Sequence, residues 1–353
     1  MSETMPSLSP FVFDPDKEPL QEQAIFEGLL SKSDHAIWVG REKHRKTNVV
    51  LQFAICAAIG RDFLNFRFVA PKPLKIVYVD YESKSHKLWE RYKAICRAMN
   101  LSEAENELLK NNLKIIEVRR MQKEGMIFIR FQVRVKKEFQ ENYNAFWQSF
   151  IEDFPADLYI FDPMRCMHSQ DENDSNIEAL LTKLRQFFGE ASIIVPHHMS
   201  KRGNKPDAIS LKDGMRQWSD GARGSGAIKA HSDVIICQER VIENETEIIY
   251  FGAFMKDEAD IDPIPLEESD AMSFYWQVSP EMPDHLRGSY DALKKAGGKF
   301  GSKKAAINIL EKAGVNIKTG YKHLSELKSL GFLKTKDGEM VLQILDASQI
   351  RVS

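Results

Sequence analysis

Cysteine is scarce in this chain of 353 residues, which contains only four. Neighbouring cysteines lie 40 or more residues apart, so none has the spacing of a CxxC redox motif or of a Cys/His metal site. This excludes a small disulfide scaffold, and we expect mostly structural thiols in a reducing, cytoplasmic setting. The four are Cys56, Cys96, Cys166 and Cys237.

Long hydrophobic runs are missing as well. The longest strongly apolar run, residues 49–59, is interrupted by Gln52 and is about half as long as a bilayer-spanning helix must be. The chain opens with Met1 and polar residues, without the basic and then apolar pattern of a secretory leader. We therefore expect no membrane partner.

The remaining composition is typical of a soluble globular protein, with 43% hydrophobic and 28% charged residues. The formal net charge of −2 conceals an asymmetry. Residues 285–353 carry 13 Lys and Arg against 6 Asp and Glu, a charge of +7, so the other 284 residues carry −9. A basic C-terminal module predicts binding to nucleic acid phosphates, and a solubilising charged face is the alternative.

Apolar runs typical of strands alternate with helical patterns along most of the chain. This order predicts an α/β fold with a mostly parallel sheet and helices on its faces. The expected strands are 36–39, 74–80, 113–118, 127–135, 158–162, 193–195, 234–237 and 248–251, and the expected helices are 47–59, 82–99, 144–154 and 177–188. We expect a lead-in at 1–35 with a short helix near 20–30, a core at 36–256 and an acidic, proline-containing linker at 257–284.

The last segment, 285–353, has a different pattern. Three helices are expected at 289–295, 302–312 and 318–330, followed by strands at 332–336 and 339–345 that turn at Asp337-Gly338. Three helices with a two-stranded wing predict a small winged helix-turn-helix domain.

The first expected strand leads into a turn and a helix with the spacing of a phosphate-binding loop. In the pattern G-x-x-x-x-G-K-[ST], Gly40, Lys46 and Thr47 are in register, and Arg45 replaces the second glycine. Lys46 would reach the β- and γ-phosphates of ATP, and Thr47 would hold Mg²⁺. The position before the lysine commonly has a positive φ, which costs a non-glycine residue on the order of 1–2 kcal/mol. A basic turn before a buried helix is the alternative. The expected nucleotide-binding residues are Gly40, Arg41, Glu42, Lys43, His44, Arg45, Lys46, Thr47 and Asn48.

Two carboxylates at strand ends favour the ATPase interpretation. The apolar run 158–161 ends in Asp162, as in a Walker B element whose carboxylate orients Mg²⁺. Glu82 follows the strand end at Asp80 by two residues, where it could act as general base toward an attacking water. Each alone could be a solvated strand-end residue, but their order on alternating strands points to one site.

Together these residues resemble the RecA-fold P-loop ATPases, and specifically the RepA-like hexameric helicases of plasmids and mobile elements. The resemblance covers about residues 25–255. Its motifs are 40–47, 60–64, 77–82, 161–163, 171–174, 197–201 and 223–227.

The resemblance implies that Lys46 and Thr47 bind phosphate and Mg²⁺, that Asp162 orients the metal and that Glu82 is the catalytic base. His198 would sense the γ-phosphate, although a structural histidine pair with His197 is the alternative.

Arg223 would project into a neighbouring subunit as an arginine finger, with Lys201 and Arg202 as competitors. The polar loop 201–220 would meet single-stranded DNA, or would be an ordinary surface loop. The basic segment 119–140 looks like a strand-rich insertion that contacts nucleic acid or a partner subunit, or else is a solvated hairpin.

In a winged helix the second motif helix enters the major groove and the wing rests on the DNA backbone. Docking of a protein is the alternative use. The candidate DNA contacts are Lys303, Lys304, Lys318, Thr319, Tyr321, Lys322, Lys334 and Lys336.

The residues and the resemblance together predict a homo-oligomer, either a ring such as a hexamer or a filament, that hydrolyses Mg²⁺-ATP on single-stranded DNA in the replication or maintenance of a mobile element. One alternative is a DNA-binding adaptor in which Arg45 marks lost ATPase activity. Another is a recombination or defence ATPase that loads partners without unwinding DNA.

Overall fold

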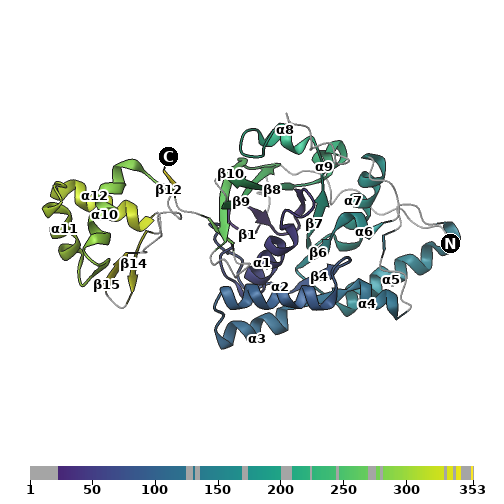
Figure 1. Ribbon diagram of the computed structural model, residues 1–353. Helices are drawn as coiled ribbons and strands as arrows, with labels where there is room; N and C mark the ends of the chain where they lie inside the picture. Colours follow the sequence, from purple (N-terminus) through teal and green to yellow (C-terminus); the bar gives the residue numbers. More distant parts are fainter. Residues whose placement is uncertain are drawn as a thin grey trace, which may run out of the picture.

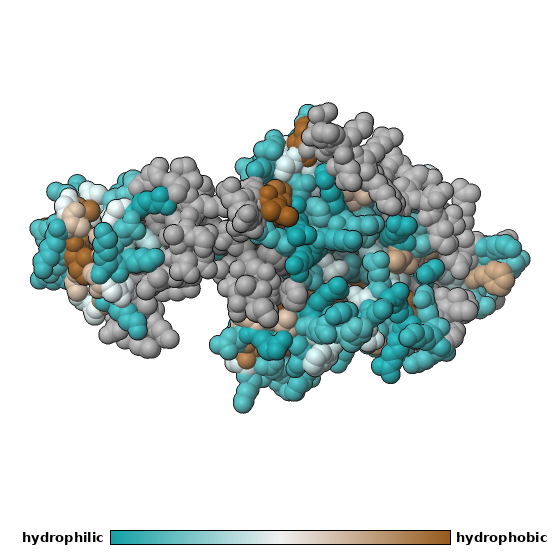
Figure 2. All heavy atoms as spheres, viewed as in Figure 1, coloured by the Kyte–Doolittle hydropathy of each residue, from teal (hydrophilic) through white to brown (hydrophobic). Residues whose placement is uncertain are grey.

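The computed structural model describes residues 23–124, 130–131, 136–168, 174–199, 209–222, 225–243, 246–268, 276–278, 281–329, 332–336, 339–342 and 351–352. Within these ranges no helix has both the length and the apolar character needed to cross a membrane. Figure 2 shows mostly hydrophilic residues on the described surface in this view, with small, separate hydrophobic patches.

A nine-stranded sheet runs through the larger part of the chain, in the order β11-β10-β9-β8-β3-β7-β6-β4-β5 (Figure 1). The six strands from β8 to β5 are parallel, and β9, β10 and β11 continue the sheet antiparallel. The strands are β3 (His35–Gly40), β4 (Ile76–Asp80), β5 (Leu113–Glu117), β6 (Leu158–Asp162), β7 (Ser192–His198), β8 (Val234–Glu243), β9 (Thr246–Met255), β10 (Ile261–Glu268) and β11 (Trp276–Val278). The predicted α/β core with a mostly parallel sheet is confirmed.

Helices cover both faces of the sheet, which is why its central parallel strands are apolar throughout. Along β3, Ala36 and Trp38 pack under the first helix layer, and Ile37 and Val39 pack under the second. The first layer is α1 (Lys46–Ile59), α2 (Ser85–Ala98) and α3 (Glu103–Asn112). The second is α5 (Gln140–Asp153), α6 (Met164–Met167), α7 (Asp174–Phe188) and α9 (Ser225–His231). As its sequence predicts, α1 is buried nearly all round.

The helix expected near 20–30 is wrong in its described part. The chain instead forms a short hairpin of β1 (Ala24–Phe26) and β2 (Leu30–Ser31). Gly28 in its turn has φ +70°, a left-handed conformation that interrupts a helix. The ring of Phe26 packs 4.8 Å, centroid to centroid, from that of Phe53 on α1, so the hairpin closes one end of the core.

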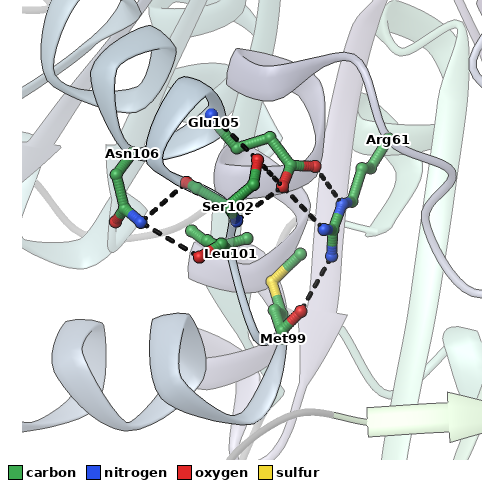
Figure 3. A network of polar contacts seen from close by, with 6 residues as sticks. All are labelled: Arg61, Met99, Leu101, Ser102, Glu105 and Asn106. Carbon is green, nitrogen blue, oxygen red and sulfur yellow. Dashed lines mark hydrogen bonds and ion pairs between the residues drawn. The ribbon is translucent and has the colours of Figure 1, made fainter.

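Helix α3 was not predicted, although its capping box is legible in the sequence. Ser102 accepts a hydrogen bond from the backbone N–H of Glu105, whose carboxylate accepts from the Ser102 N–H in return. Figure 3 shows Arg61, at the end of α1, joining this box: its Nη2 lies 2.8 Å from Glu105 Oε2 and its Nη1 donates to the Met99 carbonyl. The network ties the start of α3 to the end of the helix that begins at the phosphate loop.

Two further expectations differ from the structure. The expected linker 257–284 contributes β10 and β11 to the sheet, where Ile261 and Leu266 pair with β9 across a register shift. That irregularity and two prolines hide the strand period. In the segment 119–140, the described residues form α4 (Val118–Lys123) and a 3₁₀ turn at 137–139 rather than strands. Most of the expected strand 127–135 lies outside the described residues.

The C-terminal residues have a hydrophobic core of their own, which includes Leu286, Leu310, Leu324 and Leu327. The three expected helices and the two expected strands are present, and a short third strand completes a sheet in the order β13-β15-β14. The elements are α10 (Asp284–Lys295), β13 (Lys299–Phe300), α11 (Lys303–Lys312), α12 (Ile317–Ser329), β14 (Leu333–Lys336) and β15 (Glu339–Leu342). Just before them, β12 (Glu281–Met282) pairs with β16 (Arg351–Val352).

Candidate functional site

The phosphate loop runs from the end of β3 to the start of α1. Arg45, the residue before the helix, has φ +63° and ψ +16°, the left-handed conformation expected of a glycine at this position. Gly40, at the other end of the loop, has no room for a side chain, because a Cβ there would lie 2.7 Å from the Gln238 carbonyl oxygen and 2.9 Å from Lys46 Cδ. The loop therefore keeps its shape although one of its two glycines is replaced.

Glu247 of β9 forms an ion pair with the side chain of Arg45. Arg45 Nε lies 3.3 Å from Glu247 Oε1, and Arg240 Nη2 of β8 lies 2.7 Å from Glu247 Oε2. Each partly exposed ion pair is worth about 0.2–1 kcal/mol, and the left-handed conformation costs an arginine about 1–2 kcal/mol. The stabilisation by the ion pairs and the cost of the left-handed conformation are therefore of similar size. Arg45 is one of the predicted nucleotide-binding residues, but its side-chain charge is paired with Glu247.

Strand β8 supports the loop from the side. Gln238 Nε2 donates to the His44 carbonyl oxygen at 2.6 Å, and its Oε1 accepts from Trp38 Nε1 at 2.9 Å. The backbone N–H of Arg240 donates to His44 Nδ1 at 2.9 Å. Burial, in spite of the nearby carboxylate of Glu239, lowers the pKa of His44 to about 4, so the ring is neutral near pH 7 and can accept this bond.

The same strand also holds the beginning of the loop. Arg41 Nη2 lies 3.5 Å from Glu239 Oε1, while Glu239 Oε2 accepts hydrogen bonds from the Ser210 hydroxyl and the Leu211 backbone N–H. The side chains of Arg41 and His44 are therefore engaged by β8. Both were predicted as nucleotide-binding residues, and of the two it is His44 that lines the cleft described below.

Lys46 is buried, with 6% of its surface exposed. Its Nζ donates to the carbonyl oxygens of Gly40 and Arg41 at 2.6 and 2.8 Å and lies 3.2 Å from His198 Nδ1. Burial lowers the pKa of Lys46 to about 8, against the opposing effect of Asp162 and other carboxylates. At neutral pH the Lys46 side chain is therefore a charged ammonium group that is hydrogen-bonded to its own loop. The ammonium group can exchange these carbonyl oxygens for the oxygens of a phosphate.

His198 reaches this position because β7 is the neighbour of β3 in the sheet, with His198 paired in register with Gly40. On the other side of β7 lies β6, which ends at Asp162. A side chain at the end of β7 therefore lies between the phosphate loop and the expected Walker B carboxylate.

Asp162 is buried at the end of β6. Its Oδ2 accepts a 2.6 Å hydrogen bond from the Tyr78 hydroxyl, and its carboxylate also accepts one from Thr47. Burial and then the charge of Asp80, its register partner on β4, raise the pKa of Asp162 to about 6. The carboxyl group is ionised at neutral pH and directed to the threonine hydroxyl.

These groups suit a magnesium ion bound together with a nucleotide. Mg²⁺ in nucleotide sites is held by one or two protein oxygens, with phosphates and waters completing an octahedron. Thr47 and Asp162 supply a hydroxyl and a carboxylate of this kind. Within the described ranges no group of three or more His, Cys, Asp or Glu side chains could hold a metal without such help.

Glu82 lies on the exposed turn that follows β4. Asp80 Oδ1 accepts the backbone N–H groups of Glu82 and Ser83 at 3.0 and 2.6 Å, which fixes the turn. Glu82 lines a cleft of about 460 Å³ together with the loop and both metal-binding candidates. The lining residues are Lys43, His44, Arg45, Lys46, Thr47, Asn48, Glu82, Lys87, Glu90, Arg91, Asp162 and His198.

The cleft includes three charged residues of α2 that were not predicted. Lys87 Nζ lies 2.8 Å from Glu90 Oε2, and Arg91 Nη1 donates to the Ser83 hydroxyl at 3.2 Å. The sequence shows α2 as a polar helix, but its pattern does not indicate which charges face the site. A larger cavity of about 770 Å³, lined by Lys32, Asp157 and Gly189 among others, lies at the opposite ends of the strands. Ligands of parallel sheets bind at the carboxyl ends, where the phosphate loop lies.

The arginine-finger candidates Arg223, Lys201 and Arg202 lie outside the described residues, as do 171–173. Of the expected DNA-facing loop 201–220, the described part contains α8 (Met215–Ser219) and the buried Leu211.

The candidate DNA contacts on α11 and α12 are exposed, and Lys303 Nζ lies 5.2 Å from the centre of the Tyr321 ring. The exposed candidates are Lys303, Lys304, Lys318, Thr319, Tyr321 and Lys322. Lys334 and Lys336 lie on β14 of the hairpin.

No curated protein matches the sequence significantly. Among solved structures, the fold is similar to that of a KaiC-like protein from the hyperthermophilic archaeon Pyrococcus horikoshii OT3, with 12% identity and a TM-score of 0.45 over 72% of this chain and 94% of that chain. The model of the family AAA_25, described as an AAA domain, matches residues 3–204. This range is more than half of the sequence and includes the phosphate loop, Glu82, Asp162 and His198. The chain therefore belongs to the AAA_25 family of AAA domains.

Proposed function

We propose that this protein is an ATP-driven DNA motor, a RepA-like helicase that hydrolyses Mg²⁺-ATP between subunits while bound to single-stranded DNA. The observation that carries the nucleotide part is the cleft in which Lys46, Thr47, Asp162 and Glu82 meet. These four supply a phosphate-binding cation, two magnesium-binding oxygens and an exposed carboxylate, which are the groups that hydrolysis of a phosphoanhydride requires.

Each group has a separate task in this proposal. The backbone N–H groups at the start of α1 bind the phosphates, and Lys46 leaves its loop carbonyls to contact the β- and γ-phosphates. Mg²⁺, when bound, neutralises phosphate charge. Thr47 and Asp162 orient its shell, and Glu82 accepts a proton from the attacking water. His198, which contacts Lys46 before nucleotide binds, loses that contact when the lysine moves to phosphate.

The DNA part of the proposal is supported by the charge and arrangement of residues 285–353. Three helices and a hairpin carry a charge of +7, and exposed lysines lie at the starts of α11 and α12. In a winged helix these positions face the phosphates and the major groove. We propose that this module binds duplex DNA while the core acts on the single strand.

Hydrolysis by the purified protein tests the nucleotide part. We expect wild type to release phosphate from ATP, single-stranded DNA to stimulate the release, and Lys46→Ala to abolish it. The alternative function is a DNA-binding adaptor that does not turn over ATP, and the observation that favours it is the missing glycine at position 45. A silent wild type with an active Arg45→Gly variant would support the adaptor and overturn the motor.

Binding of duplex DNA at several salt concentrations tests the second part. Lys318→Ala should weaken binding for all sequences and reduce the slope of log K against log salt by about 1, as expected for one phosphate contact. Lys312→Ala, at the far end of α11, removes the same charge from a position not expected to face DNA. Equal effects of the two substitutions would overturn the proposed orientation.

A further inference from the structure

The carboxylate of Glu247 lies between Arg45, which belongs to the phosphate loop, and Arg240 of β8. Oε1 faces Arg45 Nε at 3.3 Å, and Oε2 faces Arg240 Nη2 at 2.7 Å. The backbone N–H of Arg240 in turn donates to His44 Nδ1. Strands β8 and β9 thus fix two consecutive loop residues, 44 and 45, through one carboxylate and one backbone amide.

Position 45 is where such support matters most. The left-handed conformation of Arg45 ends the loop and starts α1, so it decides where the next backbone N–H groups point. A glycine adopts this conformation at almost no cost, but an arginine prefers the right-handed or extended regions. Without a restraint, part of the population would have a loop whose amides do not converge on a phosphate.

We propose that Glu247 is a positioning residue of the nucleotide site, which holds Arg45 in the left-handed conformation and so replaces the missing glycine of the phosphate loop. The inference rests on the proposed function, because it concerns the same site. Glu247 is not among the residues that line the cleft, and in this proposal it acts through the backbone conformation of Arg45. Arg240 supports this role, because it forms an ion pair with the other oxygen of the Glu247 carboxylate.

This role predicts that the effect of a substitution at position 247 on nucleotide affinity depends on which residue stands at position 45. Glu247→Gln keeps the shape of the side chain and removes its charge, which should raise the Kd for a fluorescent ATP analogue about fivefold, the upper end for one partly exposed ion pair, with kcat at saturating ATP little changed. The reason is that an apparent Kd rises in proportion as the binding-competent fraction falls. In an Arg45→Gly background the same substitution should change Kd by less than about twofold, because glycine does not need the restraint.

Glu27→Gln is the matched control. Glu27 forms an ion pair with Arg67 at 3.0 Å in the hairpin region, where both side chains are exposed and neither lines the cleft. This substitution also breaks an Arg–Glu pair, and it should leave nucleotide affinity unchanged with either residue at position 45. A Kd increase equal to that of Glu247→Gln would show a general effect of lost ion pairs and overturn the proposal.

A second measurement separates this inference from the proposed function. Urea unfolding without nucleotide, on the wild type, both single variants and the double variant, gives the coupling between positions 45 and 247 directly. Coupling together with restored affinity in the double variant supports the role. Absence of coupling, or a double variant that binds as weakly as Glu247→Gln alone, overturns it. If the cycle shows coupling but the wild type binds no nucleotide, the proposed function is overturned, and the role of Glu247 in binding with it.

Discussion

The hydroxyl of Tyr78 donates a 2.6 Å hydrogen bond to Oδ2 of Asp162 across the pair of parallel strands β4 and β6. Tyr78 is fully buried, and burial raises its pKa well above the usual range, so the hydroxyl stays protonated and acts as a donor. The bond leaves the carboxylate a fixed direction toward Thr47. An aromatic residue in the middle of the core thus orients the expected Walker B carboxylate.

Tyr78→Phe should therefore weaken magnesium binding without touching the ion. Loss of the donor leaves Asp162 less well oriented and raises its pKa further, and partners of this kind are worth about tenfold in metal affinity. We expect the Mg²⁺ concentration for half-maximal ATP hydrolysis to rise about tenfold. The free energy of unfolding should fall by about 2 kcal/mol, because the lost bond was made to a charged group. A magnesium titration and urea unfolding measure the two effects.

Tyr159→Phe is the control for this change. Its hydroxyl donates to the Phe154 carbonyl at 2.8 Å, on the same strand as Asp162 but at the opposite end. Tyr159→Phe should lower the free energy of unfolding and leave the Mg²⁺ concentration for half-maximal hydrolysis unchanged. Equal magnesium requirements in the two variants would contradict the role given to Tyr78.

Glu82→Gln should separate binding from hydrolysis. An amide cannot accept the proton of the attacking water, so we expect phosphate release to fall at least about 100-fold, which is the low end of general-base contributions. The Kd for ATP should change less than about threefold. Single-turnover assays and equilibrium binding give the two numbers. Glu90→Gln removes another carboxylate from the same cleft, one that is paired with Lys87, and hydrolysis should persist there.

Gly40→Ala should disturb the site although it adds a single methyl group. The new Cβ would lie 2.7 Å from a backbone carbonyl of β8 and 2.9 Å from Lys46 Cδ, so the loop or the lysine must shift. We expect at least a tenfold loss of nucleotide affinity and a loss of about 1–3 kcal/mol of stability, as for overpacked cores. Gly301→Ala, where no atom lies within 4 Å, should be neutral in both assays. Wild-type affinity in Gly40→Ala would disprove this packing argument.

Nucleotide affinity should decrease as the pH rises through about 8. Burial lowers the pKa of Lys46 to about 8, from 10.5 in the unfolded chain. Because the folded state then binds this proton less tightly, its stability increases between about pH 8 and 10.5, while the cation that phosphate needs is lost. We expect the Kd for ADP, measured in EDTA, to rise about tenfold from pH 7 to pH 9. Lys46→Arg stays charged over this range, and an equally steep profile in that variant would assign the effect to another group.

The sequence reveals those parts of the site that rest on short, local patterns. The strands β3, β4 and β6 are mostly apolar runs because they are buried on both faces. At the same edge of the sheet, β3 ends in Gly40 of the phosphate loop, and β4 and β6 each end in an aspartate. Gly40, Lys46, Asp162 and Glu82 could therefore be placed before the fold was seen. The positive φ at Arg45 also follows from its place in the motif.

The residues of β8 and β9 that contact the phosphate loop could not be predicted from local sequence patterns. Glu247 lies more than 200 positions after Arg45, and its charge looks like any exposed glutamate on a strand. The supporting residues Gln238 and Arg240 became visible only when β8 was paired with β3. The acidic and proline-containing sequence of β10 hides its strand pattern, whereas Ser102 and Glu105 form a capping box whose pattern is present in the local sequence.

The position of β3 in the sheet has a consequence for the order in which the protein is made. Both neighbours of β3 come late in the chain, with Ala36 beside Ile194 on one side and Val234 on the other. Trp38 and its hydrogen-bond partner Gln238 are 200 residues apart. At 5–20 residues per second, a ribosome needs roughly 10–40 s to add that much chain. For this time the emerging polypeptide carries a phosphate-binding sequence without the strands that shape it, so the nascent chain acquires its nucleotide cleft only after β8 has left the exit tunnel.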